Sequence, residues 1–321
     1  MRNVFCSILL FLLSSLLYGQ VSPFYAKHYS HEYAINPAVA GRDYYPVVNL
    51  SLKKYVFGVD EGAPLSMAAG TSMRLGSFNF YNPHMMLNKS NFAAKSNMGL
   101  GTFVMYEQDG PINYSHATLS YAYFIPLDKG RSELSFGLSA QIFHYGLDQN
   151  MLDPLDLGDT KLENLPKNPY KPEAGFGVYY HNAQLFLGAS ANDLLLSDKA
   201  SSIYQQDVNK RDFFLQGGYK FFFKWLELEP SFLVAKIDDI PIYHYTQLKV
   251  YYLYYNWISV AYKSTQSMSY AVGLKVRRFA VGYIYEHSTS KMIQHYGGSH
   301  ELMIGLNIGL FEAEGIRKTV R

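Results

Sequence analysis

Histidines and one acidic run are the side chains in this sequence whose spacing could hold a metal ion. His28 and His31 are three residues apart and His295 and His300 are five apart, but neither pair has a second pair of ligands near it, as a zinc site needs. The run "DPLDLGD" at 153–159 spaces its carboxylates by three, unlike the alternating oxygen ligands of a calcium loop. We therefore interpret the run as a solvated loop and predict no metal ion and no cofactor.

Catalytic motifs are not found in the sequence. The strings "GLSAQ" at 137–141 and "GASAN" at 188–192 lack the second glycine of a nucleophile elbow. No Walker A loop, dinucleotide-binding glycine pattern or HExxH motif occurs, and each of these is the signature of a distinct catalytic or nucleotide site. The sequence therefore predicts no catalytic residues, and we expect the protein not to be an enzyme.

Four charged residues in the second half of the chain admit two interpretations. Glu227 and Glu229 alternate on one expected strand, and Lys220 and Lys224 do so on its neighbour. They could form a charged constriction that selects solutes, or they could pair across neighbouring strands inside a closed barrel. We favour pairing, because charges on the lipid face of a barrel cost roughly 2–4 kcal/mol near the middle of the membrane.

The elements that would position these side chains are β-strands. From Val47 onward the chain repeatedly alternates apolar with small or polar residues, and it shows no sustained helical stripe, which predicts an all-β protein. In the closing segment, for example, apolar residues at 302, 304, 306, 308 and 310 alternate with Glu301, Met303, Gly305, Asn307 and Gly309. About fourteen such segments are expected, at 47–55, 63–75, 98–107, 112–126, 132–147, 173–181, 184–192, 212–223, 225–236, 242–252, 256–264, 267–276, 278–287 and 299–311.

The composition of the less apolar face favours a transmembrane antiparallel β-barrel over a soluble secreted sandwich. That face carries mainly Gly, Ser, Ala, Gln and Tyr rather than Lys and Glu, as in a barrel lumen. Charged residues make up 17% of the chain, against roughly 25% in typical soluble domains. The net charge of +2 gives no indication of nucleic acid as a partner. An even strand count is typical of bacterial outer-membrane barrels.

The expected organisation has four parts. Residues 1–19 have the charged, apolar and small-residue regions of a signal peptide, and Cys6 lies before its apolar run, so it cannot be a lipidation site. Residues 20–46 form a periplasmic lead-in segment, 47–311 the barrel, and 312–321 a periplasmic tail. Most long connections then face the cell exterior and most short turns the periplasm; the long connection at 76–97 is the exception.

Five fragments resemble the PorP/SprF family of the Bacteroidetes type IX secretion system, in order and at similar intervals. They are "YAINPAVAGRD" at 33–43, "DEGAP" at 60–64, "GLGTFVMYEQDGPIN" at 99–113, "GFGVYYHNAQLFLGASANDLL" at 175–195 and "GGSHELMIGLNIG" at 297–309. The first resembles the A-I-N-P-A-x-A-G element that precedes the first strand in that family. Lys53-Lys54-Tyr55 departs from the family's usual first-strand pattern.

The resemblance implies a non-enzymatic protein integral to the outer membrane and in contact with its lipid. It implies a role in secretion, or in surface retention of specific secreted proteins such as gliding adhesins, through protein contacts. Implied partners are type IX secretion components, including a periplasmic peptidoglycan-binding lipoprotein, and a secreted client with a C-terminal secretion domain. The family-motif residues are Asn36, Pro37, Gly41, Gly62 and Pro64, with a structural or partner-docking role.

Two questions stay open from the sequence. The lead-in segment could close the periplasmic mouth of the barrel or present a docking surface there, since Asn36-Pro37 favours an extended residue followed by a turn and Gly41 permits a bend. The alternative function is an outer-membrane channel or solute transporter, which the small and polar lumen face would also suit.

Overall fold

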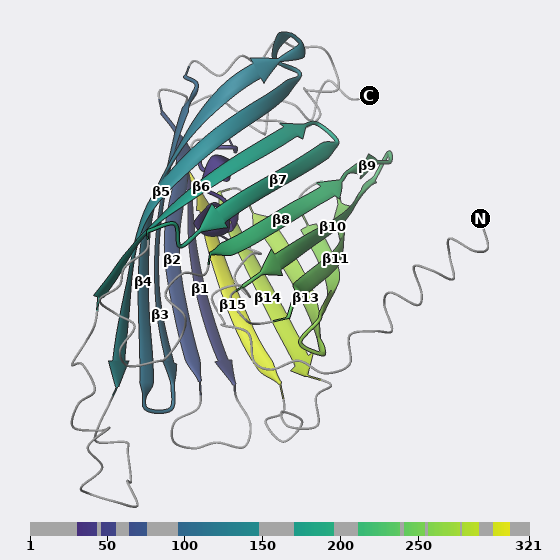
Figure 1. Ribbon diagram of the computed structural model, residues 1–321. Helices are drawn as coiled ribbons and strands as arrows, with labels where there is room; N and C mark the ends of the chain where they lie inside the picture. Colours follow the sequence, from purple (N-terminus) through teal and green to yellow (C-terminus); the bar gives the residue numbers. More distant parts are fainter. Residues whose placement is uncertain are drawn as a thin grey trace, which may run out of the picture.

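A computed structural model describes the arrangement of the strands in space (Figure 1). It describes residues 31–43, 46–55, 64–75, 96–147, 170–195, 211–237, 241–253, 256–276, 278–288 and 298–308. The strands are β1 (Val47–Tyr55), β2 (Leu65–Arg74), β3 (Met98–Asp109), β4 (Ile112–Leu127), β5 (Ser132–Leu147), β6 (Tyr170–Asn182), β7 (Leu185–Asn192), β8 (Asp212–Tyr219), β9 (Phe221–Phe222), β10 (Leu226–Lys236), β11 (Tyr243–Tyr252), β12 (Asn256–Lys263), β13 (Ser267–Val276), β14 (Phe279–Ser288) and β15 (Ser299–Asn307).

These strands close into one antiparallel barrel. Apart from β8 and β9, which both pair with β10, each strand pairs with its neighbour in sequence. β10 also pairs with β11, and β1 pairs with β15. β9 continues β8 in the same register along β10, so the wall has fourteen positions. The break between β8 and β9, at Lys220, lies opposite Glu229 and Pro230 of β10. Proline has no backbone N–H, so it cannot donate a hydrogen bond to the neighbouring strand there. The predicted all-β transmembrane barrel is thus confirmed.

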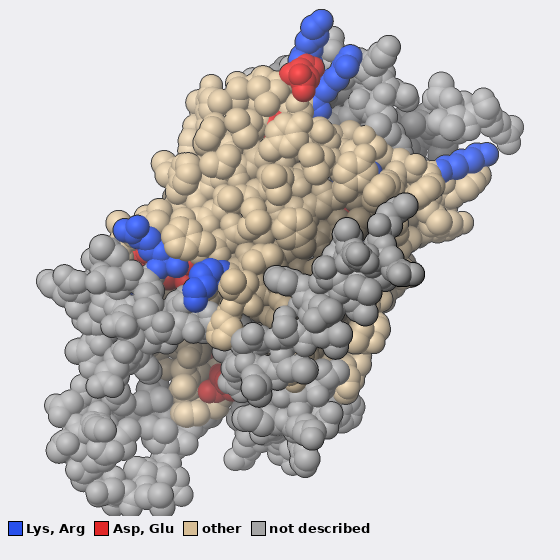
Figure 2. Space-filling view, turned by 45° about the vertical axis from the view of Figure 1, so that its right-hand side comes forward, with Lys and Arg blue, Asp and Glu red and all other residues tan. Residues whose placement is uncertain are grey.

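The two faces of the wall show that this is not a soluble sandwich. Leu138 and Val276 are 61% and 68% exposed on the outer face, whereas Ser135 and Ser139 are buried on the inner one. A soluble sandwich would bury the leucines and valines. Figure 2 shows a broad outer face without Lys, Arg, Asp or Glu, with charged residues gathered toward its two ends, as a lipid-facing band requires.

The barrel has two ends that we name for what they carry. The terminal end is where β1 begins and β15 ends, and it includes the tight turn at η3 (Asp128–Gly130) between β4 and β5. The opposite end includes the turn at 110–111 between β3 and β4. The connections that leave β5 and β7 at this end, 148–169 and 196–210, lie outside the described residues. The predicted last strand reaches residue 311, but β15 ends at Asn307. None of the described helices is long and apolar enough to cross a membrane.

Candidate functional site

Residues 31–43 lie inside the barrel, and we call them the plug. The plug contains one helical turn, α2 (Glu32–Ile35), and a 3-10 turn, η2 (Pro37–Val39). α2 contacts β3 and β4, and η2 contacts β4, β5 and β6; Figure 1 shows both turns in purple within the ring of strands. Every residue from 33 to 41 is buried. In this position the plug occupies the lumen and does not present its motif residues as an outer docking surface.

Asn36 fixes the turn between the two helical segments and ties it to the wall. Its backbone is extended, as expected before Pro37, and its side-chain oxygen accepts a hydrogen bond from the backbone N–H of Ala38 at 3.0 Å. The side-chain amide donates to the carbonyl oxygens of Val178 and Ala189 at 3.2 and 3.4 Å. One side chain therefore both caps η2 and bonds to two neighbouring strands.

Glycines of the inner wall make room for the plug. A Cβ added at Gly137 would lie 2.1 Å from the backbone nitrogen of Ala38, and one at Gly99 would lie 2.0 Å from the carbonyl oxygen of Ala40. Real Cβ atoms essentially never come within 3.0 Å of another heavy atom, so these positions admit only glycine while the plug is seated. Added Cβ atoms would also come within 3.0 Å of plug atoms at Gly70, Gly101, Gly177 and Gly188.

Hydroxyl and amide groups of the wall satisfy the backbone of the plug. Ser120 donates to the carbonyl oxygen of Tyr33 at 3.1 Å, and Ser135 donates to that of Ala38 at 2.7 Å. Ser190 and Asn192 both donate to the carbonyl oxygen of Ile35 at 3.0 Å, and the Gly41 N–H donates to Ser72 at 2.8 Å. Buried backbone groups need such partners. The small polar residues of the lumen face thus serve the plug.

Arg42 closes the plug on itself and on the wall. Its guanidinium is 2.6 Å from the Glu32 carboxylate and donates to the Tyr179 hydroxyl at 2.9 Å. Burial lowers the pKa of Arg42, but the carboxylates of Glu32 and Asp43 outweigh it and raise that pKa overall. Arg42 therefore stays charged and links the two ends of the plug through its ion pair with Glu32.

A second arginine holds the plug from the wall. Arg74 of β2 donates to the carbonyl oxygen of Gly41 at 3.1 Å, and its guanidinium makes two hydrogen bonds, of 2.9 and 2.8 Å, to Glu133 of β5. The Arg74 side chain is fully buried and lies 3.6 Å from the ring centroid of Phe124. A two-pronged arginine–carboxylate pair of this kind fixes geometry as well as charge. The pair bridges β2 and β5 beneath the end of the plug.

The structure brings three of the five family-motif residues together. Asn36, Pro37 and Gly41 are buried in the plug, and the φ of Gly41 is +81°, so the predicted bend is present. Pro64 lies just before β2, at the opposite end of the barrel, and Gly62 lies outside the described residues.

Sequence reasoning missed the wall residues that receive the plug, above all the Arg74–Glu133 pair. The two residues are 59 positions apart, and no local motif connects them. The glycines were visible as small residues on the less apolar face of several strands, but that pattern indicated only a lumen.

The charged residues of β8 and β10 are paired for the most part. Lys220 lies 3.0 Å from both Glu227 and Glu229, as the pairing interpretation predicts. Lys224 is not part of this cluster: it is exposed in the turn before β10, with its ammonium 5.2 Å from the ring centroid of Trp225. On the far side of the lumen, Lys53 and Lys263 each lie 2.8 Å from Glu286.

A smaller charged cluster lies where β6 begins and β7 ends, at the opposite end of the barrel. Lys171 is 2.8 Å from Glu173 and 3.9 Å from Asp193. Burial raises the pKa of Asp193 from 3.8 to about 7; Lys171 opposes this rise, and the charges of Asp212 and Glu173 add to it. Near neutral pH this carboxyl therefore exchanges its proton.

The raised pKa of Asp193 predicts a pH dependence of stability. Between about pH 4 and 7 the folded protein holds a proton that the unfolded chain, with a pKa near 3.8, has released. The free energy of unfolding should therefore fall as the pH rises through this window and level off above about 7. Denaturant unfolding of wild type and Asp193→Asn across pH 4–8 tests this, because the asparagine variant should lack that part of the slope. Parallel profiles for the two proteins would contradict it.

The metal candidates do not assemble in the described part of the chain. No group of three or more His, Cys, Asp and Glu side chains there could hold a metal ion. His31 packs in the plug, 3.3 Å from the Tyr33 hydroxyl, and His300 lies 2.5 Å from the Tyr283 hydroxyl. His28, His295 and the acidic run at 153–159 lie outside the described residues.

Solved structures of outer-membrane proteins are similar to this chain at very low sequence identity. The outer membrane protein Omp33 of Acinetobacter baumannii is 7% identical, with a TM-score of 0.48 over 84% of this chain and 100% of that chain. The CymD monoaromatic hydrocarbon channel is 10% identical, with a TM-score of 0.46 over 87% and 91%. No curated protein matches the sequence.

A family model does match nearly the whole chain. It is the model described as "Type IX secretion system membrane protein PorP/SprF", and the match covers residues 18–306. The matched region includes the plug and all the strands; only the last residue of β15, Asn307, lies beyond it.

Proposed function

The chain belongs to the PorP/SprF family of type IX secretion system membrane proteins, and from this premise we propose that it is a plugged scaffold that acts through protein contacts. In this proposal it supports the secretion or surface retention of specific secreted proteins and conducts no solute. The chain is an outer-membrane β-barrel with a role associated with type IX secretion; the scaffold mechanism and the clients are proposed.

The observation that carries the scaffold mechanism is the seated plug. Its backbone bonds to serine and asparagine side chains on four strands, and Gly99 and Gly137 leave no room for a side chain beside the plug backbone. A wall this closely fitted to its own N-terminal segment supports a closed lumen. With the lumen filled, the surfaces left for function are the two ends of the barrel.

The two ends are assigned to two kinds of partner. Most connections at the terminal end are short and most long connections lie at the opposite end, with 76–97 the exception, which matches the periplasmic and exterior sides of bacterial barrels. We place the secretion machinery, including a periplasmic peptidoglycan-binding lipoprotein, at the terminal end, with 76–97 and the tail 312–321. The client, a secreted protein with a C-terminal secretion domain, is placed at 148–172 and 193–211, because functional diversity concentrates in long loops.

Deletion of the gene tests the retention role directly. The expected result is that one or a few secreted proteins with C-terminal secretion domains disappear from the cell surface or appear in the medium, while the bulk of secretion continues. Quantitative proteomics of surface and medium fractions provides the measurement. Unchanged surface levels of every such protein would contradict the proposal.

The closed lumen predicts electrical silence. Purified protein in a planar bilayer is expected to show no stable conductance, because the plug fills one side of the lumen and Lys53, Lys263 and Glu286 pair on the other. A conducting porin measured in the same bilayer serves as the control. Reproducible conductance steps from this protein would favour the channel or transporter alternative instead.

A further inference from the structure

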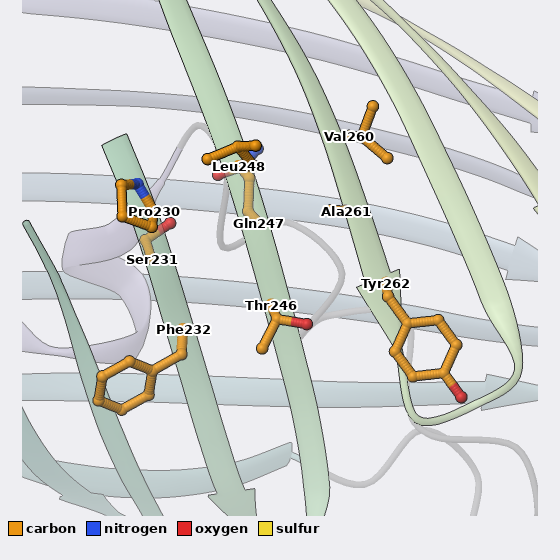
Figure 3. Close-up of a pocket in the computed structure, with 9 residues that line it drawn as sticks. All are labelled: Pro230, Ser231, Phe232, Thr246, Gln247, Leu248, Val260, Ala261 and Tyr262. Carbon is orange, nitrogen blue, oxygen red and sulfur yellow. The ribbon is translucent and has the colours of Figure 1, made fainter. Parts of the chain in front are cut away.

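The outer face of the wall has a hollow of about 550 Å³ across β10, β11 and β12. Its outward side chains form two tiers set by the strand register. Pro230, Leu248 and Val260 lie side by side in one tier, and Phe232, Thr246 and Tyr262 in the next. Figure 3 shows these six side chains around the hollow, with the inward-alternating Ser231, Gln247 and Ala261 contributing to its floor.

Side-chain size explains why the wall is depressed here. Thr246 is a short side chain between the rings of Phe232 and Tyr262, and the compact ring of Pro230 lies one tier away. Because this face of the barrel lies against lipid, a hydrocarbon chain is the occupant that its apolar lining suits.

Hydroxyl groups mark one edge of the hollow. Thr246 and Tyr262 are in the tier nearer the opposite end of the barrel, and Figure 3 shows both hydroxyls on that side. A hydroxyl in an apolar setting is stabilised by a hydrogen-bond partner. The ester or amide linkages at the start of a lipid's acyl chains offer suitable acceptors.

A lysine and an arginine follow the hydroxyls toward the same end. Lys236 is four residues beyond Phe232 along β10, about 13 Å at strand rise. Arg211, which is exposed, precedes β8, whose Phe213 pairs with Lys236. The neighbouring Asp212 is buried, and Asp238 and Asp239 lie outside the described residues.

We propose that this hollow seats an acyl chain of an anionic, phosphate-bearing lipid from the leaflet at the opposite end. The hydrocarbon lies between Pro230, Phe232 and Leu248, and the phosphate lies beside Lys236. Apolar hollow, hydroxyls and basic groups occur in the order in which such a lipid presents its chain, linkage and headgroup. Basic side chains near a membrane surface attract anionic lipid headgroups.

Lipid retained by the purified barrel tests the site. The full protein, taken from outer membranes in mild detergent and examined by native mass spectrometry, should carry one phosphorylated lipid per barrel. After delipidation, it should rebind lipopolysaccharide at least tenfold more tightly than the same lipid with its phosphates removed, or than phosphatidylethanolamine. Equal binding of the phosphorylated and dephosphorylated lipids would overturn the proposal.

Paired variants separate the site from the rest of the lipid-facing wall. Thr246→Trp, which fills the hollow, should reduce retained lipid at least tenfold, whereas Leu138→Trp, on the outer face of β5, should not. Lys236→Glu should weaken rebinding about tenfold, whereas Lys54→Glu, an exposed lysine at the same end of β1, should not. If Thr246→Trp does not fold, the Lys236 and Lys54 pair decides alone. Equal loss in a test variant and its control would also overturn the proposal.

Discussion

Replacing Gly137 by alanine is expected to expel the plug from the lumen. The new Cβ would lie 2.1 Å from the backbone nitrogen of Ala38 and 2.3 Å from the carbonyl carbon of Pro37. Both atoms belong to plug backbone, which no side-chain rotation can move aside. Overpacking a well-packed core typically costs about 1–3 kcal/mol, and here relief requires the plug backbone to shift. We therefore expect exposure of the plug as the main effect.

Cysteine labelling measures that exposure. In a Cys6→Ser background, Ala34→Cys places a single thiol in the plug at a position that is 3% exposed. A maleimide should label this thiol slowly in the otherwise wild-type barrel, and at least tenfold faster when Gly137→Ala is added. The faster rate would show that the plug has left the wall while the barrel remains assembled, provided that the strand content by circular dichroism is unchanged.

Gly282→Ala provides the matched control. Gly282 also lies on the inner face, but an added Cβ there would meet its nearest neighbour, a ring carbon of Trp257, at 3.4 Å, which is ordinary contact. Labelling of Ala34→Cys should stay slow in this variant. Slow labelling in Gly137→Ala as well would mean that the plug does not depend on the glycine wall.

Removing Arg74 is expected to cause a large loss of stability. Arg74→Met would leave the buried Glu133 carboxylate without its two hydrogen bonds and would also remove the bond to the Gly41 carbonyl. Breaking a buried pair from one side typically costs about 3–5 kcal/mol, because an uncompensated charge remains. The free energy of unfolding, from denaturant titration of the barrel in detergent, should fall by about that amount.

A double variant and a surface control test the cause. Arg74→Met combined with Glu133→Gln should recover part of the loss, because the stranded charge is then gone. Arg131→Met, in the exposed turn before β5, should change stability by less than about 0.5 kcal/mol. If the double variant were no more stable than Arg74→Met alone, the loss would come from something other than the Glu133 carboxylate that has lost its hydrogen bonds from Arg74.

Both variants test what keeps the plug seated in the lumen. Gly137 acts by leaving space for the plug, whereas Arg74 acts by bonding to its end at Gly41. If both variants expose the plug, its seating depends on shape and on charge together. The conductance of each variant then shows whether the plug by itself keeps the barrel closed.

The sequence alone determined the strands and the faces of this protein. Period-two alternation fixes which residues point the same way, because successive side chains of a strand lie on opposite faces. Spacing therefore assigns Leu134, Phe136 and Leu138 to one face and Ser135 to the other. The many Gly, Ser, Ala and Gln residues of the less apolar face then favour a membrane barrel over a soluble sandwich, although charged residues such as Lys53, Glu133 and Glu286 also lie there, in ion pairs. Strand ends agree to within a few residues, and β15, for example, ends at Asn307 rather than at 311.

Only the tertiary structure decided what fills the barrel and what the small residues are for. Alternation places Gly137 and Ser135 in the lumen but cannot say what they meet there, because that depends on residues about 100 positions away along the chain. The same holds for Arg74 and Glu133, which become partners only when the closed ring brings β2 and β5 to the same side of the plug. Backbone geometry within a few residues decides which face of a strand each side chain lies on. The position of the plug depends instead on contacts that exist only after the strands have closed around it.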